Sequence, residues 1–331
     1  MTPTSDTTIQ RPDLGQAVYE TMQNAPNMGY IGNMVMPYFR VSAQAANFPV
    51  IPKEALFNLL DTKRGPLGHY NRSEDEFEDG YYSTSENGLE RRIDERYAAI
   101  YGTRFAYEMT IANILMQDIL RAQEYRVANK LFNETNFETA IAAGTTWTTT
   151  ATASPSDDVD TGKESMRSLG VIPDTLVMNY NTYLKCIANT EVKTQIYQMF
   201  PDAAKTGDVT VNHLKTYFNL PNIYVAGSLK NTAKRGQDAS LADIWSDTYA
   251  LLCKVSTGDI TEPCIGRTFL WNEGASQEVI TEQYYSDEVR SDILRVRHDT
   301  AETFLASYDS DNAVKSAISK AAGYLIDVTG N

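Results

Sequence analysis

The sequence predicts an α+β protein, and three features carry that prediction. Apolar residues spaced three to four apart run through a long stretch of the first half and predict one dominant helix. Short β-prone segments alternate with helical patterns in the second half. The chain has 331 residues, of which 42% are hydrophobic, so it can bury the core of one large or two modest domains.

Residues 1–55 are predicted to form an arm that adds to the surface of another part. The start of the chain is polar, and the spacing of Leu14, Val18 and Met22 predicts a short helix after it. From residue 31 to 52, prolines interrupt β-prone residues. Because proline cannot donate a backbone hydrogen bond, we expect edge strands or extended pieces here.

Residues 56–88 are predicted to form a long extended loop. Glycines and charged residues punctuate this stretch, which lacks the apolar pattern of a core. The alternation around Phe77, Tyr81 and Tyr82 is compatible with a two-stranded loop, and a wholly flexible insert is the alternative. A loop of this length without a core indicates a function or a contact with another molecule.

One amphipathic helix is predicted from an N-cap at Asn87 to about Phe132, with a bend near Gly102. If continuous, this helix would reach roughly 60 Å. A weak β signal over residues 147–153 precedes a second predicted helix at 155–169, which has a proline in its first turn.

The block of residues 172–265 is predicted to be a compact α+β domain, and strands follow it to the end of the chain. Within the block we expect strands at 175–178, 223–226 and 244–255, and helices at 183–199 and 211–218. After it we expect a strand at 268–271, a hairpin of 279–285 with 293–296, and a strand at 324–328. The long helix is the natural surface on which these last strands pack.

Two segments carry a resemblance to a known family. The first is TWTTTATASPSDDVDTGKESMRSLGVIPDTLVMNYNTYLKCI, residues 146–187, and the second, which is less specific, is MVMPYFRVSAQAANFPVIPKEALF, residues 34–57. Together with the order of the predicted elements from about Asp13 onward, they resemble the Hong Kong 97-type fold of tailed-bacteriophage major capsid proteins.

The resemblance implies a division of the chain. It comprises an N-terminal arm (1–55), an extended β-hairpin loop (56–88), a peripheral domain with the spine helix (89–171), an axial domain (172–265) and peripheral-domain return strands (266–331). No extension resembling a fused scaffolding domain precedes the arm, and no lysine and asparagine pair for crosslinking can be assigned.

The resemblance also implies a structural function and no catalytic residue. The chain is expected to assemble with itself into hexamers and pentamers of an icosahedral shell that encloses double-stranded DNA. A separate scaffolding protein, a portal protein and a decoration protein are the implied partners. The expected location is the virion, after assembly in the host cytoplasm.

The net charge of −14 fits a shell that encloses DNA without gripping it. Affinity for nucleic acid rests on phosphates neutralised by Lys and Arg, so an acidic chain is not expected to bind DNA sequence-specifically. We find no apolar run long enough to span a bilayer, and we expect no membrane association.

The charges around the loop suggest contacts between subunits. A basic stretch precedes an acidic cluster, and further arginines follow on the predicted spine helix. The candidate residues are Lys63, Arg64, Arg72, Glu74, Asp75, Glu76, Glu78, Asp79, Arg91, Arg92 and Arg96. Opposite patches that meet between subunits are one interpretation, and a solvated loop whose charges contribute below about 1 kcal/mol each is the other.

No motif for catalysis, a cofactor or a metal stands out. The three cysteines and three histidines are widely spaced, and Asp157, Asp158 and Asp160 lack the glycine and glutamate of a calcium loop. No phosphate-binding glycine loop or GxSxG elbow occurs. Two alternatives stay open: an encapsulin-like compartment of the same fold, and a pocket enzyme without a recognisable motif.

Overall fold

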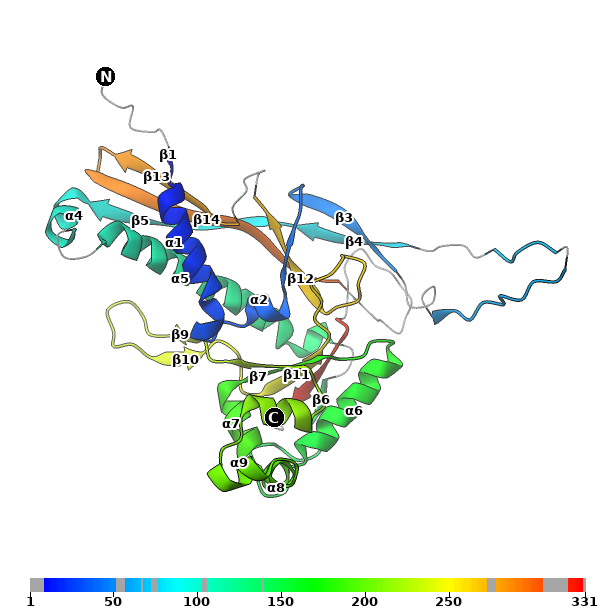
Figure 1. Cartoon of the computed structure of the whole chain (residues 1–331). Coiled ribbons are helices and arrows are strands. Elements are labelled where there is room, and N and C mark those ends of the chain that lie inside the picture. Colours follow the sequence, from blue (N-terminus) through cyan, green and yellow to red (C-terminus); the bar gives the residue numbers. More distant parts are fainter. Residues whose placement is uncertain are drawn as a thin grey trace.

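Two β-sheets and one long helix organise the chain (Figure 1). The computed structural model describes residues 9–51, 57–66, 68–72, 77–102, 106–137, 140–272, 278–305 and 321–329.

The first sheet is built around β14 (Ser291–Phe304). Along one edge, the first half of β14 pairs antiparallel with β13 (Ile280–Ser286) and the second half pairs antiparallel with β12 (Gly266–Trp271). The other edge of β14 pairs antiparallel with β5 (Ser85–Asp94). Two strands of the N-terminal segment complete the sheet: β1 (Ile9–Gln10) pairs with β13, and β2 (Tyr38–Arg40) pairs in parallel with β12.

Helix α5 (Tyr107–Leu131) covers one face of the first sheet. Helix α1 (Pro12–Gln23) packs on α5, and the buried core between them and the sheet contains Leu14, Val18, Leu115, Met116, Ile119, Leu294 and Val296. Short helices complete this half: η1 (Ala25–Met28), α2 (Gly32–Val35), α4 (Glu95–Tyr101) and η2 (Glu134–Asn136).

The second sheet has the strand order β6 (Ala140–Ala142), β15 (Gly323–Asp327), β11 (Tyr249–Cys253), β7 (Thr175–Asn179) and β8 (Asn222–Ala226). Strands β15 and β7 are buried along their whole length because both faces of the sheet are covered. One face packs on its helices: α6 (Pro155–Ser168), α7 (Tyr180–Ala188), α8 (Thr190–Met199), α9 (Pro201–Thr206) and α10 (Val211–Tyr217). The other face packs on the C-terminal end of α5 and on α2.

Two small hairpins project from this body. Strands β9 (Leu229–Asn231) and β10 (Leu241–Asp243) form one. Strands β3 (Ala45–Val50) and β4 (Glu78–Ser83) form the base of the other, and the described part of the loop between them extends far from both sheets (Figure 1). Phe48 and Tyr82 anchor this base on Phe269 of the first sheet.

Most predicted elements are confirmed. The structure contains the short N-terminal helix, the helix at 155–168, the strands at 175–179, 222–226 and 266–271, the helix at 211–217, and the hairpin of 280–286 with 291–304. The loop has two strands at its base, as the alternation near Tyr82 indicates, and one proline-rich piece forms the edge strand β2.

Four predictions are wrong. Residues 85–94 are strand β5 and not the start of the long helix, so Asn87 is no N-cap. The helix expected over 183–199 is two helices, α7 and α8, because Asn189 adopts an extended conformation and caps the second. Residues 147–153 form turns, and the strand expected over 244–255 is only β11.

The last strand forms where expected but has an unexpected partner. Strand β15 pairs with β11 and β6 in the second sheet, and not with the strands of residues 266–304. The division into arm, loop, peripheral and axial domains stays a prediction.

Candidate assembly surfaces and the junction between the sheets

The extended loop leaves large apolar side chains bare. Leu59 exposes 96% of its surface and Tyr70 exposes 74%, and Leu60 and Phe77 are also exposed. Singly exposed apolar residues are ordinary, but several gathered on one projecting loop mark a surface that another molecule covers. The loop is therefore the first candidate for an assembly contact.

The basic residues of the loop are exposed and flank its apolar groups. The Arg64 guanidinium lies 4.5 Å from the centre of the Tyr70 ring, and its Nε donates a hydrogen bond of 2.7 Å to the Gly68 carbonyl. Lys63 and Arg72 are exposed. This arrangement orders part of the loop and keeps its positive charge at the surface.

The remaining charged candidates do not gather with the basic residues. Residues 74–76 lie outside the described residues, Glu78 pairs with Val50 in the β3–β4 ladder, and Asp79 is exposed. Arg91 is already paired within the chain, because its Nη2 lies 2.8 Å from Asp118 Oδ2 of α5.

Arg92 lies on the edge strand β5, and Arg96 lies in α4. Both are exposed. The charge contacts between subunits stay a prediction.

A buried carboxylate joins three parts of the chain that are far apart in sequence. Glu124 of α5 is only 3% exposed. Its carboxylate accepts hydrogen bonds from the backbone N–H groups of Ile31 at 2.8 Å and Gly32 at 2.7 Å, and from the Trp245 indole at 2.6 Å. Glu124 therefore ties the N-terminal segment and the second-sheet half to the long helix.

Two glycines permit the close approach at this junction. Gly29 has a φ of 81°, and an added Cβ there would lie 2.9 Å from the backbone of Gly227. A Cβ on Gly32 would lie 2.5 Å from the Glu124 carboxylate. Side chains at either position would push the N-terminal segment away from the residues it contacts.

The junction makes stability depend on pH. Burial raises the pKa of Glu124, and the three hydrogen bonds that it accepts only partly oppose this. Because the pKa is raised in the folded state, protonation of Glu124 stabilises that state. This contribution to the free energy of unfolding is fully present below the ordinary carboxyl pKa of 4.5, and it is lost as the pH rises through the raised pKa.

We expect the free energy of unfolding of the wild type to fall relative to that of Glu124→Gln as the pH rises through that window. Denaturant unfolding of both proteins from about pH 4 to 8 measures the difference. Glutamine does not ionise, so groups that titrate in both proteins cancel. Parallel pH profiles would contradict the raised pKa.

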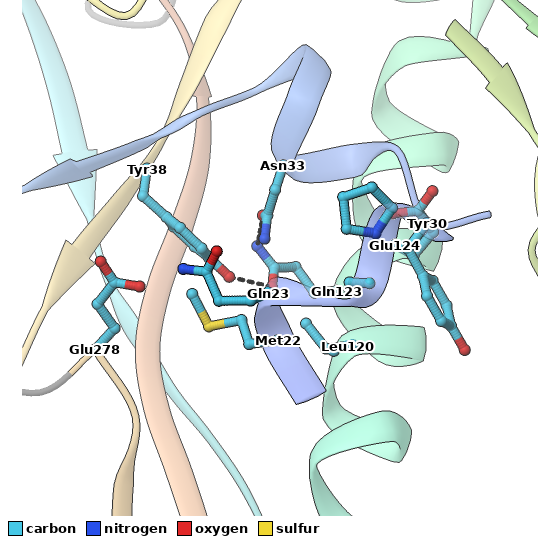
Figure 2. A pocket seen from close by; sticks show the side chains of 11 residues that line it. Met22, Gln23, Tyr30, Asn33, Tyr38, Leu120, Gln123, Glu124 and Glu278 are labelled. Atoms are coloured by element: carbon cyan, nitrogen blue, oxygen red, sulfur yellow. Dashed lines mark hydrogen bonds between the residues drawn. The ribbon is translucent and has the colours of Figure 1, made fainter. Parts of the chain in front are cut away.

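A cavity of about 290 Å³ adjoins the junction between α1, η1 and α5 (Figure 2). The Tyr38 hydroxyl donates to Gln123 Oε1 at 2.7 Å, and Gln123 Nε2 donates to Asn33 Oδ1 at 3.0 Å. Burial raises the pKa of Tyr38 to about 12, so the hydroxyl stays a donor. The described lining residues include no histidine, cysteine, serine or lysine.

A half-buried acidic residue, Asp158, fixes the start of α6. Asp158 accepts hydrogen bonds from the Trp147 indole at 2.8 Å and the Gly144 backbone at 3.0 Å. In the sequence, Asp158 was considered only as part of a calcium loop, and Glu124 did not stand out. A signal existed for Glu124, since it falls on the apolar side of a helical pattern, where an acidic residue needs a partner.

Within the described ranges, no group of three or more His, Cys, Asp or Glu side chains is placed to hold a metal ion. None of the described helices is both long and apolar enough to cross a bilayer.

The comparisons with known proteins identify the fold. No protein-family model and no curated protein matches the sequence. A solved structure of a phage-related protein from Bordetella bronchiseptica is similar over 98% of this chain and 99% of its own, with 20% identity and a TM-score of 0.67.

Two further structures are similar at 12% identity. A virus-like particle from Pyrococcus furiosus matches over 94% of this chain and 98% of its own, with a TM-score of 0.55. A Mycobacterium phage Adephagia structure matches over 92% of each chain, with a TM-score of 0.52. The chain has the Hong Kong 97-type capsid fold over nearly its whole length.

Proposed function

We propose that the chain is the major capsid protein of a tailed bacteriophage, which assembles into hexamers and pentamers around double-stranded DNA. The observation that carries the proposal is the fold shared over nearly the full length of a phage-related protein and a virus-like particle. In keeping with a structural role, the described cavity at the junction holds amide, phenol and carboxyl groups that bond to one another or to the backbone.

The exposed loop supports a role in assembly. A shell is stable when each subunit makes many contacts that are weak singly, because simultaneous engagement raises the effective concentration. The bare apolar side chains of the loop, Leu59, Leu60, Tyr70 and Phe77, are the type that such a contact buries. We place the loop against a neighbouring subunit.

The charge of the chain supports enclosure of DNA without tight binding. With a net charge of −14, the subunit repels the phosphate backbone, and packed DNA can move past it. A separate scaffolding protein, a portal and a decoration protein complete the proposed set of partners. The proposed location is the virion, following assembly in the host cytoplasm.

A compartment without DNA is the second candidate. The similarity to the Pyrococcus furiosus virus-like particle favours it, because that structure is as complete a match in coverage as the phage structure. The contents of purified particles distinguish the candidates. Packaged DNA supports the capsid, and a protein cargo without DNA supports the compartment.

The first experiment is expression of the chain alone and with its neighbouring reading frames. Negative-stain electron microscopy and mass photometry then report the assembly state. Closed shells or rings of subunits are the expected result. A stable monomer or dimer in both settings would overturn the proposal.

Reversing the basic charges of the loop is expected to reduce assembly. In Lys63→Glu/Arg64→Glu, repulsion replaces attraction to the acidic surface of a neighbour, so particle yield should fall most at low salt, where screening is weakest. Sedimentation measures the yield. Reversal of Lys234 and Arg235, an exposed basic pair on the β9–β10 hairpin, is the matched control. Wild-type yields at low and high salt would show that the loop charges are merely solvated.

A further inference from the structure

Strand β5 has one unused edge. It pairs with β14 over its full length, Ser85–Asp94, and no other described strand pairs with it. A long edge strand presents backbone donors and acceptors that another strand can use. Such edges are usually protected, yet β5 has Gly88 and a 43% exposed Leu89 at its middle.

The two faces of β5 are set by its neighbours. Ile93 packs in the core beneath α5 and Arg91 pairs with Asp118 of α5, so these residues and Leu89, which alternates with them, lie on the α5 face. Glu90 lies on the opposite face, where its carboxylate accepts a 2.6 Å hydrogen bond from Arg295. Arg92 shares that face and is exposed.

The sequence of β5 is complementary to itself in one antiparallel register. With Leu89 opposite Leu89 of a second copy, Glu86 lies opposite Arg92 twice, and no two like charges are opposed. If the two strands shift by two residues in one direction, Glu86 lies opposite Asp94 of the second copy and the two copies of Glu90 lie opposite each other. A slip the other way opposes Glu86 to Glu90. Opposite charges across strands stabilise a pair and like charges destabilise it.

Exposed aromatic residues flank this edge in matching positions. In the register centred on Leu89, the end of one β5, where α4 begins, meets the start of the other, where β4 ends. Tyr97 of α4 and Tyr81 of β4 are exposed by 55% and 53% in the single chain. Both elements therefore lie at the ends of the paired strands.

We propose that β5 pairs with β5 of a second copy around a two-fold axis at Leu89, which joins two first sheets into one. The contact deepens the proposed function, on which it rests, because an icosahedral shell contains two-fold axes that such a self-complementary surface can occupy. Backbone hydrogen bonds supply the attraction, and the Glu86 and Arg92 pairs set the register.

Disulfide trapping tests the contact. The variant Leu89→Cys places two thiols at the axis, where directly opposed Cα atoms in antiparallel strands lie roughly 4.5–5.5 Å apart, within the range that a disulfide spans. The native Cys186, Cys253 and Cys264 are buried, so they give little background. Leu241→Cys, an exposed leucine on β10, is the control for chance collisions.

Mild oxidation should convert Leu89→Cys from monomer to dimer on a non-reducing gel, with no dimer from Leu241→Cys. Charge reversal gives a second readout: Glu86→Arg or Arg92→Glu alone should reduce trapping of Leu89→Cys, and the two together should restore it. Restoration is not expected if the charges do not meet.

Electron microscopy of the same samples separates the two proposals. Particles without Leu89→Cys dimers would overturn the β5 contact and leave the shell standing. Dimers without particles would support the contact and overturn the shell. The absence of both would overturn both.

Discussion

Glu124→Leu is expected to lower the free energy of unfolding by about 3–5 kcal/mol, because it leaves buried hydrogen-bond donors without an acceptor. The Ile31 and Gly32 N–H groups and the Trp245 indole all donate to this carboxylate. Leucine is close in volume but accepts no hydrogen bond. The cost falls on contacts that join the N-terminal segment and the second-sheet half to α5.

Denaturant unfolding of the unassembled subunit measures the loss. Glu108→Leu is the control, because Glu108 lies on the same helix with a 43% exposed side chain and is paired only with Arg11, at 3.4 Å; its replacement should change stability by no more than about 1 kcal/mol. Glu124→Gln keeps one acceptor oxygen, so its free energy of unfolding should lie between those of Glu124→Leu and Glu108→Leu. Equal stability of Glu124→Leu and Glu108→Leu would show that the junction does not depend on the carboxylate.

Leu59→Ser/Leu60→Ser is expected to abolish particles while leaving the fold of the subunit intact. Both leucines are exposed in the single chain, so their replacement removes no contact within it. Burying a leucine at a contact contributes about 1.5–3 kcal/mol. Since every subunit in a shell repeats the contact, a loss of this size at each copy should prevent closure.

Particle yield by sedimentation and subunit stability by thermal unfolding are the two measurements. Leu241→Ser is the control, because Leu241 is 65% exposed and lies on β10, outside the loop. It should assemble like the wild type. Normal particles from the double variant would show that the loop leucines are not part of the assembly contact.

The sequence predicted correctly those helices and strands whose formation depends on residues within the element itself. The helix at 155–168 has a proline in its first turn, acids near its start and an arginine near its end, and all of these act within the helix itself. Strand β7 is buried along its whole length and apolar at its centre, Leu176 to Met178, as expected of a strand covered on both faces. The order of such elements carried the resemblance to the capsid fold.

The elements that were predicted wrongly depend on pairing with strands that are distant in the sequence. In residues 85–94, Leu89 and Ile93 fit both the helical and the strand spacing, and only the ten-residue ladder with β14 selects the strand. The same holds for β15, because its apolar sequence fits either sheet and its position between β6 and β11 is a tertiary choice. No local pattern reports such a choice.

The candidate surfaces were predictable only in part. The loop stood out through its composition, and its exposed position supports that prediction. The junction at Glu124 did not stand out, since its partners Gly32 and Trp245 lie 92 and 121 residues away along the chain. The charge contacts between subunits require a neighbour that a single chain does not provide.

The position of β15 also determines when the second sheet can be completed. During synthesis, β6 and β11 leave the ribosome well before β15, yet β15 is the strand that lies between them. Until residues 323–327 emerge, the second sheet lacks an inner strand, and the apolar residues of β11 lack cover. Domains generally fold as units as they emerge, so the second sheet is completed only after synthesis passes β15.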